Sequence, residues 1–77
     1  MRIYIFKSEA MTELRAFTGD HSGSQLPGQF APWTATGVVS AQAHLPFRLS
    51  RAHVEKAIRD RGFQLWRSKP KKEGEAN

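Results

Sequence analysis

Three side chains with the chemistry of a hydrolytic triad stand next to one another in the sequence, as Asp20, His21 and Ser22. A triad needs its base and orienting carboxylate to approach the serine from different directions, which consecutive positions of one loop do not allow. The surrounding string also misses the G-x-S-x-G spacing of a nucleophile elbow, because its serine stands one position too late. We therefore interpret residues 19–24, from Gly19 to Ser24, as a polar surface loop, and we expect no catalytic residue.

Metal-ligand types are scattered along the chain. The three histidines are His21, His44 and His53, and no two of them have the four-residue spacing of a zinc site on one helix face. Cysteine is absent, which excludes disulfide bonds, thiolate ligands and thiol nucleophiles. The sequence predicts neither a metal ion nor a cofactor.

Charge is unevenly distributed along the chain. There are 12 Lys and Arg against 7 Asp and Glu, a net charge of +5, and the excess lies entirely after residue 47. This asymmetry indicates a polyanion, such as nucleic acid bound without base specificity, or an acidic protein partner. The alternative is a solvated surface that keeps a small protein soluble. The candidate partner surface consists of Arg48, Arg51, Lys56, Arg59, Arg67, Lys69, Lys71 and Lys72.

Aromatic residues offer a second kind of site, because rings interleaved with basic residues stack on bases. Strand alternation separates Tyr4 from its neighbours Ile3 and Ile5, and Trp66 from Leu65. We expect one sheet face rich in Ile and Leu under a helix, and an aromatic face with Tyr4, Trp33 and Trp66 that serves as a ligand platform or dimer interface. The alternative is that residues 26–32 fold back over this aromatic face.

Local patterns define the elements that position these residues. The β-branched and aromatic run in residues 2–7 predicts a central strand, and residues 33–40 predict a third strand with a bulge near Gly37. Residues 14–18 favour a second strand, although apolar residues three apart in residues 9–17 would also suit an amphipathic helix.

The sequence pattern for a helix is stronger than the pattern for any of the strands. Ser50 has the chemistry of an N-cap, Gly62 that of a left-handed C-terminal residue, and Val54, Ala57 and Ile58 form one apolar stripe between them. The spacing predicts a helix over residues 51–61, followed by a last strand in residues 63–67.

These elements predict an α+β fold: a small, mostly antiparallel sheet of three to four strands with one main helix, in the order β-β-β-α-β. If the last two strands were neighbours, their connection would be a parallel, right-handed crossover. Residues 1–67 form a single domain, and residues 68–77 are a disordered basic and polar tail. A chain of 77 residues buries a small core, so a homodimer is an available source of stability.

The first apolar run, in residues 3–6, is shorter than the apolar region of a signal peptide, and no run approaches the length of a membrane span. We expect a cytoplasmic protein without membrane contact.

Several segments resemble a group of short, uncharacterised bacterial proteins. They are residues 4–9, 17–20, 26–27, 30–33, 49–51 and 62–67. The resemblance implies a free-standing bacterial protein and carries no activity, cofactor or site residue.

Taken together, these patterns favour a non-enzymatic binding module that meets a protein partner or polyanion through its basic C-terminal third. The alternative hypothesis is a small-ligand binder or small enzyme that uses the 19–24 loop near Trp33 and Trp66.

Overall fold

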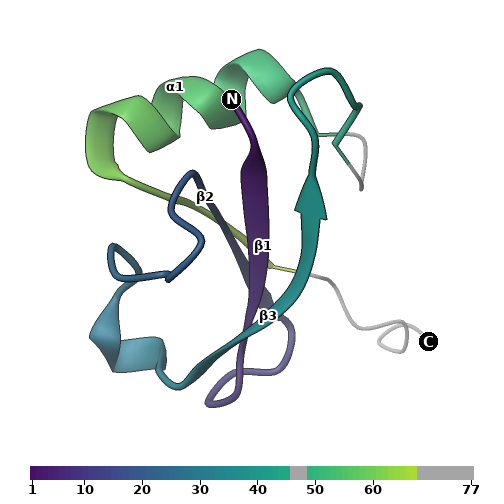
Figure 1. Cartoon of the computed structure of the whole chain (residues 1–77). Helices are drawn as coiled ribbons and strands as arrows, with labels where there is room; N and C mark the ends of the chain where they lie inside the picture. Colours follow the sequence, from purple (N-terminus) through teal and green to yellow (C-terminus); the bar gives the residue numbers. More distant parts are fainter. Residues whose placement is uncertain (46–48, 68–77) are drawn as a thin grey trace, which may run out of the picture.

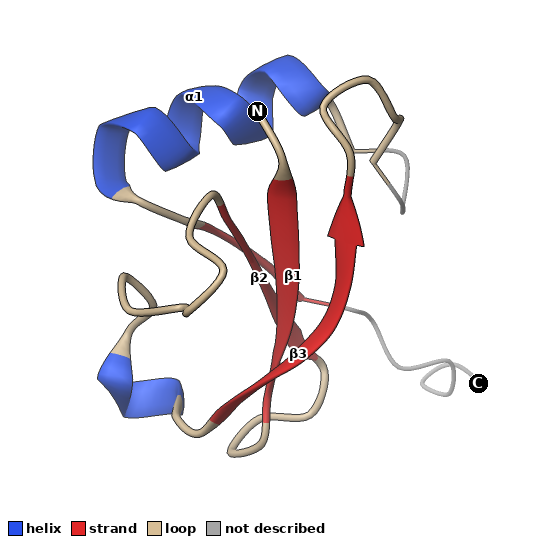
Figure 2. Ribbon diagram, viewed as in Figure 1, coloured by secondary structure: helices blue, strands red, loops and turns tan. Residues whose placement is uncertain are grey.

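The computed structural model describes residues 1–45 and 49–67. Four antiparallel strands form one sheet in the order β3-β1-β2-β4, and one helix, α1, crosses one end of it (Figure 1). The bounds are Ile3–Ser8 for β1, Leu14–Thr18 for β2, Trp33–Val39 for β3, Arg51–Arg61 for α1 and Gln64–Arg67 for β4, with a short 3-10 turn over Gly28–Phe30. This arrangement confirms the predicted small α+β fold (Figure 2).

Residues 14–18 form a strand, not part of a helix. Both edges of β2 are paired, with β1 on one side and β4 on the other. Leu14, Ala16 and Phe17 are consequently buried. The alternative of a helix over residues 9–17 is wrong, because two ladders of hydrogen bonds and burial on both faces outweigh a weak helical pattern.

Helix α1 has the predicted bounds and the predicted caps. The Ser50 hydroxyl accepts a hydrogen bond from the backbone N–H of His53 at 3.3 Å. Gly62 adopts a left-handed conformation with φ of 96°, and its N–H donates to the carbonyl of Ile58 at 2.8 Å. An N-cap of this type contributes about 0.5–2 kcal/mol to helix stability.

The last strand lies on the far edge of the sheet from β3, so the conditional parallel crossover does not occur. Strand β4 pairs antiparallel with β2. A buried side chain fixes this arrangement: the Thr18 hydroxyl, at the end of β2, donates to the carbonyl of Gly62 at 2.9 Å. The chain leaving α1 is thereby held beside β2.

The sheet is covered on both faces, by two separate clusters. The helix side carries Ile3, Phe17, Val39, Leu45, Val54 and Ile58, with Trp66 packed against them. The loop side carries Phe6, Ala16 and Leu26, with Tyr4, Trp33, Phe63 and Leu65 packed against them. Residues 19–32 cover the loop side, as Leu26 and the path of the connection show (Figure 1).

The predicted single aromatic face is therefore wrong in its composition. Tyr4 and Trp33 lie on the loop side under the 19–32 connection, whereas Trp66 lies on the helix side. The reason is the register of β4, in which Trp66 is opposite Arg15 and Leu65 is opposite Ala16.

Within the described ranges no helix is long and apolar enough to cross a membrane. The candidate tail over residues 68–77 lies outside the described residues.

Candidate functional site

One row of side chains crosses all four strands. The pairing register places Thr34 of β3 opposite Lys7 of β1, Lys7 opposite Arg15 of β2, and Arg15 opposite Trp66 of β4. We call these four residues the cationic row. Because side chains alternate along a strand, Lys7 lies on the same face as Ile3, which is the helix side.

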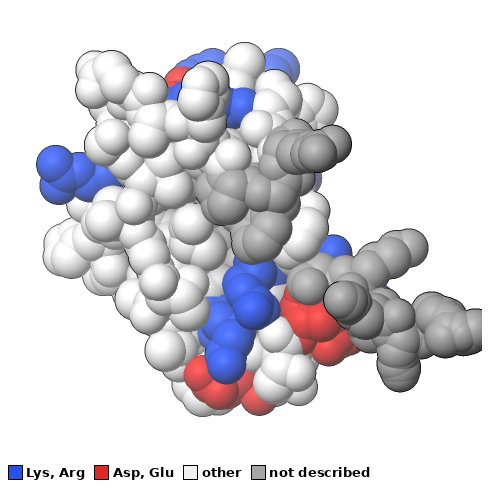
Figure 3. Space-filling model, turned by 90° about the vertical axis from the view of Figure 1, so that its right-hand side faces the viewer, with Lys and Arg blue, Asp and Glu red and all other residues white. Residues whose placement is uncertain are grey.

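The two cations of the row lie beyond the part of the sheet that α1 covers, whereas Trp66 packs against the helix-side cluster. The helix packs on Ile3, Phe17 and Val39, whereas Lys7 and Arg15 stand further along their strands and are half-buried. Figure 3 views the molecule from the side away from the 19–32 connection, and Lys and Arg surface gathers there below the helix, bordered by Asp and Glu. Lys7 and Arg15 are the basic residues that the register places on this part of the sheet.

The two cations of the row have no ionic partner in the described chain. The ion pairs there join Arg51 to Glu55 at 2.8 Å, Lys56 to Asp60 at 2.8 Å and Arg59 to Glu55 at 3.9 Å, all along α1. Lys7 makes none of these, and Arg15 donates to the carbonyl of Thr12 at 2.7 Å. Like charges directly opposite on a sheet are destabilising, so the native structure tolerates a repulsion here.

A carboxylate marks one end of the row. Glu9 accepts a hydrogen bond from the Thr34 hydroxyl at 2.5 Å. The row therefore runs from an anionic end at β3 to cations on the central strands and an indole on β4. An anionic ligand would be directed away from Glu9 and toward Arg15.

The basic residues predicted from sequence are dispersed. Arg51 is structural: besides Glu55, it donates to the carbonyls of Ala43, at 2.7 Å, and of Met1. Lys56 and Arg59 lie on the outer face of α1 beside acidic side chains. Arg67 is exposed and donates to the Met11 sulfur at 3.3 Å. Arg48, Lys69, Lys71 and Lys72 lie outside the described residues.

Lys7 and Arg15 were not singled out by the sequence. Before residue 48 the net charge is zero, because Lys7, Arg15 and Arg2 are balanced by three carboxylates, those of Glu9, Glu13 and Asp20. Arg15 stands two residues from the buried Phe17, and Lys7 two residues from the half-buried Ile5, so alternation places both on the core face. The pairing of β1 with β2, which makes them neighbours, has no local signature.

Two of the predicted aromatics make structural contacts on the loop side of the sheet, and Trp66 packs on the helix side. The Trp33 indole N–H donates to the carbonyl of Pro27 at 3.0 Å, and its ring meets Phe30 edge-on at 6.3 Å between centroids. The Tyr4 ring lies 6.2 Å from the ring of His21, in the connection that covers it. Of the three aromatics, only Trp66 belongs to the cationic row.

The 19–24 loop is built around one carboxylate. Asp20 accepts hydrogen bonds from the Ser22 N–H at 3.0 Å, the Ser22 hydroxyl at 2.9 Å and the Ser24 hydroxyl at 2.5 Å. The bond from Ser24, followed by those from Ser22, lowers the pKa of Asp20 from 3.8 to about 2. Ser22 thus donates to Asp20, while the ring of His21 faces Tyr4. This geometry holds a turn and does not align a nucleophile with a base.

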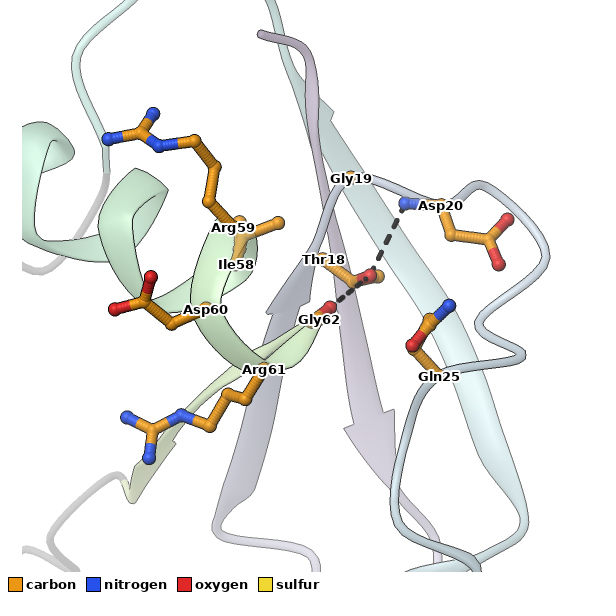
Figure 4. A pocket seen from close by; sticks show the side chains of 9 residues that line it. All are labelled: Thr18, Gly19, Asp20, Gln25, Ile58, Arg59, Asp60, Arg61 and Gly62. Carbon is orange, nitrogen blue, oxygen red and sulfur yellow. Dashed lines mark hydrogen bonds between the residues drawn. The ribbon is translucent and has the colours of Figure 1, made fainter.

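An open hollow of about 510 Å³ lies between this loop and the end of α1. Its lining residues are Thr18, Gly19, Asp20, Gln25, Ile58, Arg59, Asp60, Arg61 and Gly62 (Figure 4). Neither Trp33 nor Trp66 lines it. In Figure 4 the carboxylates of Asp20 and Asp60 lie on opposite sides of the hollow, and the Thr18 hydroxyl at its base is bonded to Gly62 and to the N–H of Asp20.

In the part of the chain that the structure describes, no three His, Asp or Glu side chains come together as a metal-ion ligand set. Comparison with protein-family models, with curated proteins and with solved structures finds no match. The functional assignment therefore depends on the geometry of this chain.

Proposed function

We propose that this protein is a non-enzymatic binding module that engages single-stranded nucleic acid through the cationic row, without reading its bases. The observation that carries the proposal is the pair Lys7 and Arg15, directly opposite each other on an open part of the sheet and without a carboxylate in ion-pair distance among residues 1–45 and 49–67. Their repulsion is relieved when a phosphate group binds between them.

The spacing of the pair suits a phosphate backbone. Neighbouring strands lie about 4.8 Å apart, so two cations on adjacent strands reach the same phosphate or successive phosphates of one strand. An antiparallel sheet face with basic and aromatic side chains is a surface on which single strands bind with little base preference. Trp66 supplies the indole at the β4 end of the row.

The basic C-terminal third adds to the same surface in this proposal. Strand β4 ends at Arg67, and Lys69, Lys71 and Lys72 follow it in the sequence. The chain thus joins these residues to the end of the sheet that carries the row. Each phosphate contact they add would increase the salt dependence of binding. In this proposal the protein acts in the cytoplasm, where nucleic acid is accessible.

The test is fluorescence anisotropy with labelled mixed-sequence single-stranded RNA and DNA over a series of salt concentrations. We expect binding at low salt, and we expect the logarithm of the binding constant to fall linearly with the logarithm of the salt concentration. Lys7→Thr and Arg15→Thr each lower affinity for all sequences and reduce the slope by about one. Lys56→Thr, which removes the same charge from the outer face of α1, leaves affinity within twofold.

Three outcomes overturn the proposal. They are absence of binding at low salt, binding without salt dependence, and row variants that bind as well as the Lys56→Thr control. Inorganic polyphosphate and an acidic peptide are run in parallel. Tighter binding of polyphosphate than of either nucleic acid rejects nucleic acid as the ligand, and exclusive binding of the peptide points to a protein partner.

A second function is supported by the hollow beside the 19–24 loop. Its mixed lining, with Arg59, Asp60 and Arg61, would suit a small polar ligand. Chemical-shift perturbation by small anionic compounds, confined to Gly19 and Gly62 and their neighbours, would support it. Perturbations spread over the whole surface would count against it.

A further inference from the structure

Strand β3 is an edge of the sheet with no cover in the described chain. It has a neighbour, β1, on one side only. Five consecutive residues, 34–38, are exposed, and Val38 has 57% of its surface accessible, the larger fraction of the two exposed large apolar residues. An edge of this kind presents a line of unpaired backbone N–H and C=O groups.

The backbone groups on the outer side of β3 have no hydrogen-bond partner among residues 1–45 and 49–67. No hydrogen bond from a turn, loop or cap reaches a backbone group of residues 33–39, and none comes from a side chain in residues 1–45 or 49–67. The polar contacts of β3 side chains turn inward or along the edge: Thr36 donates to the carbonyl of Ile5 at 3.3 Å, and Thr34 to Glu9. The outer ladder of β3 is therefore available to another strand.

The two edges of the sheet are protected very differently. Strand β4 has only four residues, ends in Arg67, and is followed in the sequence by Lys69 and Pro70, which are residues that discourage strand pairing. Strand β3 has seven residues, Trp-Thr-Ala-Thr-Gly-Val-Val, with no charge and no proline. A long, uncharged and exposed edge is a pairing surface.

One irregularity interrupts the β3 edge and limits regular pairing to the residues on either side of it. The register between β1 and β3 shifts where Ile5 faces Gly37 and Phe6 faces Ala35, which leaves Thr36 as an extra residue. A bulge like this adds local twist and obstructs a regular strand. The sequence has no cysteine for a disulfide bond, so a second copy of this chain is the source of the additional buried area that a core of this size lacks.

We infer that two copies of this chain associate through β3, in antiparallel fashion, to form one continuous eight-stranded sheet. A two-fold axis perpendicular to the sheet keeps the same face of each copy on the same side. Both helices and both cationic rows then lie on one face of the dimer. The extra buried area also compensates for a core limited by a chain of 77 residues. This inference does not depend on the proposed nucleic-acid binding.

The experiment is sedimentation equilibrium of the full chain from micromolar to millimolar concentration, with amide hydrogen exchange on the same samples. We expect the mass to rise from 8.7 kDa toward twice that value. Exchange of the outward-pointing amides in residues 34–38 slows in step with dimer formation, whereas the β3 amides that face β1 and amides elsewhere in the sheet do not change.

Val38→Lys places a charge on the exposed β3 edge, near the end of the strand, and is expected to shift the association to at least tenfold higher concentration. Gln29→Lys adds the same charge at an exposed position in the 19–32 connection and keeps the wild-type association. Both variants are checked for folding by circular dichroism, and Thr36→Lys provides a second edge variant.

Three results would overturn the inference. The first is a monomer at every concentration. The second is a dimer that the edge variants leave unchanged. The third is protection of the outward-pointing amides of residues 34–38 that does not depend on concentration, which would mean that a segment of the same chain covers the edge.

Discussion

Lys7 and Arg15 face each other across β1 and β2, and no carboxylate in the described chain lies within ion-pair distance of either. Directly opposite side chains have Cβ atoms about 5 Å apart, and a like-charged pair at this position costs about 0.2–1 kcal/mol. A protein that carries such a pair on its central strands loses stability by it. If the pair is kept because it binds a ligand, removing it should raise the free energy of unfolding and lower the binding affinity.

Replacing Lys7 by Thr should therefore stabilise the fold. We expect the free energy of unfolding to rise by about 0.2–1 kcal/mol, because the repulsion is removed and Thr is favourable in a strand. Urea denaturation followed by circular dichroism measures this. The matched variant Lys56→Thr removes a lysine paired with Asp60 and should lower stability by about 0.3–0.5 kcal/mol. A loss of stability in Lys7→Thr would instead assign the lysine a structural role.

Loss of the Thr18 hydroxyl is expected to destabilise the fold. This residue is fully buried; its hydroxyl donates to Gly62 at 2.9 Å and accepts from the N–H of Asp20 at 3.3 Å. Thr18→Val keeps the shape and leaves both backbone groups without these bonds, which should cost about 1–3 kcal/mol. Thr36→Val removes an exposed hydroxyl bond of 3.3 Å and should change unfolding free energy by less than about 0.5 kcal/mol. Equal effects of the two substitutions in urea titrations would contradict the anchoring role of Thr18.

Gly23 combines a left-handed backbone with a close contact. Its φ is 72°, and a Cβ atom there would lie 3.1 Å from the Phe6 ring and 3.3 Å from Leu26. Gly23→Ala should destabilise the protein by about 1 kcal/mol or more, since the connection would have to move off the loop side of the sheet. Gly28 has open space around its Cβ position and no positive φ, so Gly28→Ala should be neutral or slightly stabilising. Thermal unfolding of the two variants side by side tests this difference.

Asp20 should make the 19–24 loop sensitive to acid. Its pKa is lowered from 3.8 to about 2 in the folded protein, so the unfolded chain binds the proton more readily. The stabilisation by the ionised group is complete above about pH 4 and is lost as the pH falls toward 2. An NMR titration of the Asp20 side-chain carboxyl carbon should give a midpoint near 2.

Ser24→Ala should raise that pKa toward 3.8, because the hydroxyl of Ser24 makes the largest contribution to the shift. Ser40→Ala, at an exposed position after β3, should leave the midpoint unchanged. A midpoint near 3.8 in the unaltered protein would show that the hydrogen bonds of the loop do not persist in solution.

The elements of this fold could be predicted well because their signals are local. Ser50 and Gly62 bound α1 on both sides, and the β-branched run of β1 specifies a strand from neighbouring residues alone. Residues 14–18 were ambiguous because their local pattern suits both a helix and a strand. Only the pairing with β1 on one side and β4 on the other makes them a strand.

The candidate site was less predictable. Arg51 has the same charge as Lys7, yet Arg51 is used to hold residues 43 and 1 against the helix, whereas Lys7 stands without an ionic partner in the described chain. Composition counts both equally. Distinguishing them requires the position of every carboxylate and carbonyl around each side chain, which composition does not contain.

The sequence alone determined the class of fold, the bounds of the helix and the absence of cysteine chemistry, because caps, alternation and residue types act over a few positions. Only the tertiary structure decided which strands are neighbours, and with that the cationic row, the position of β3 at an edge of the sheet and the side on which Trp66 lies. The physical reason is the two-residue period of a strand. A slip of one position in the pairing of β4 with β2 would move Trp66 to the opposite face, and no local pattern in the sequence specifies that register.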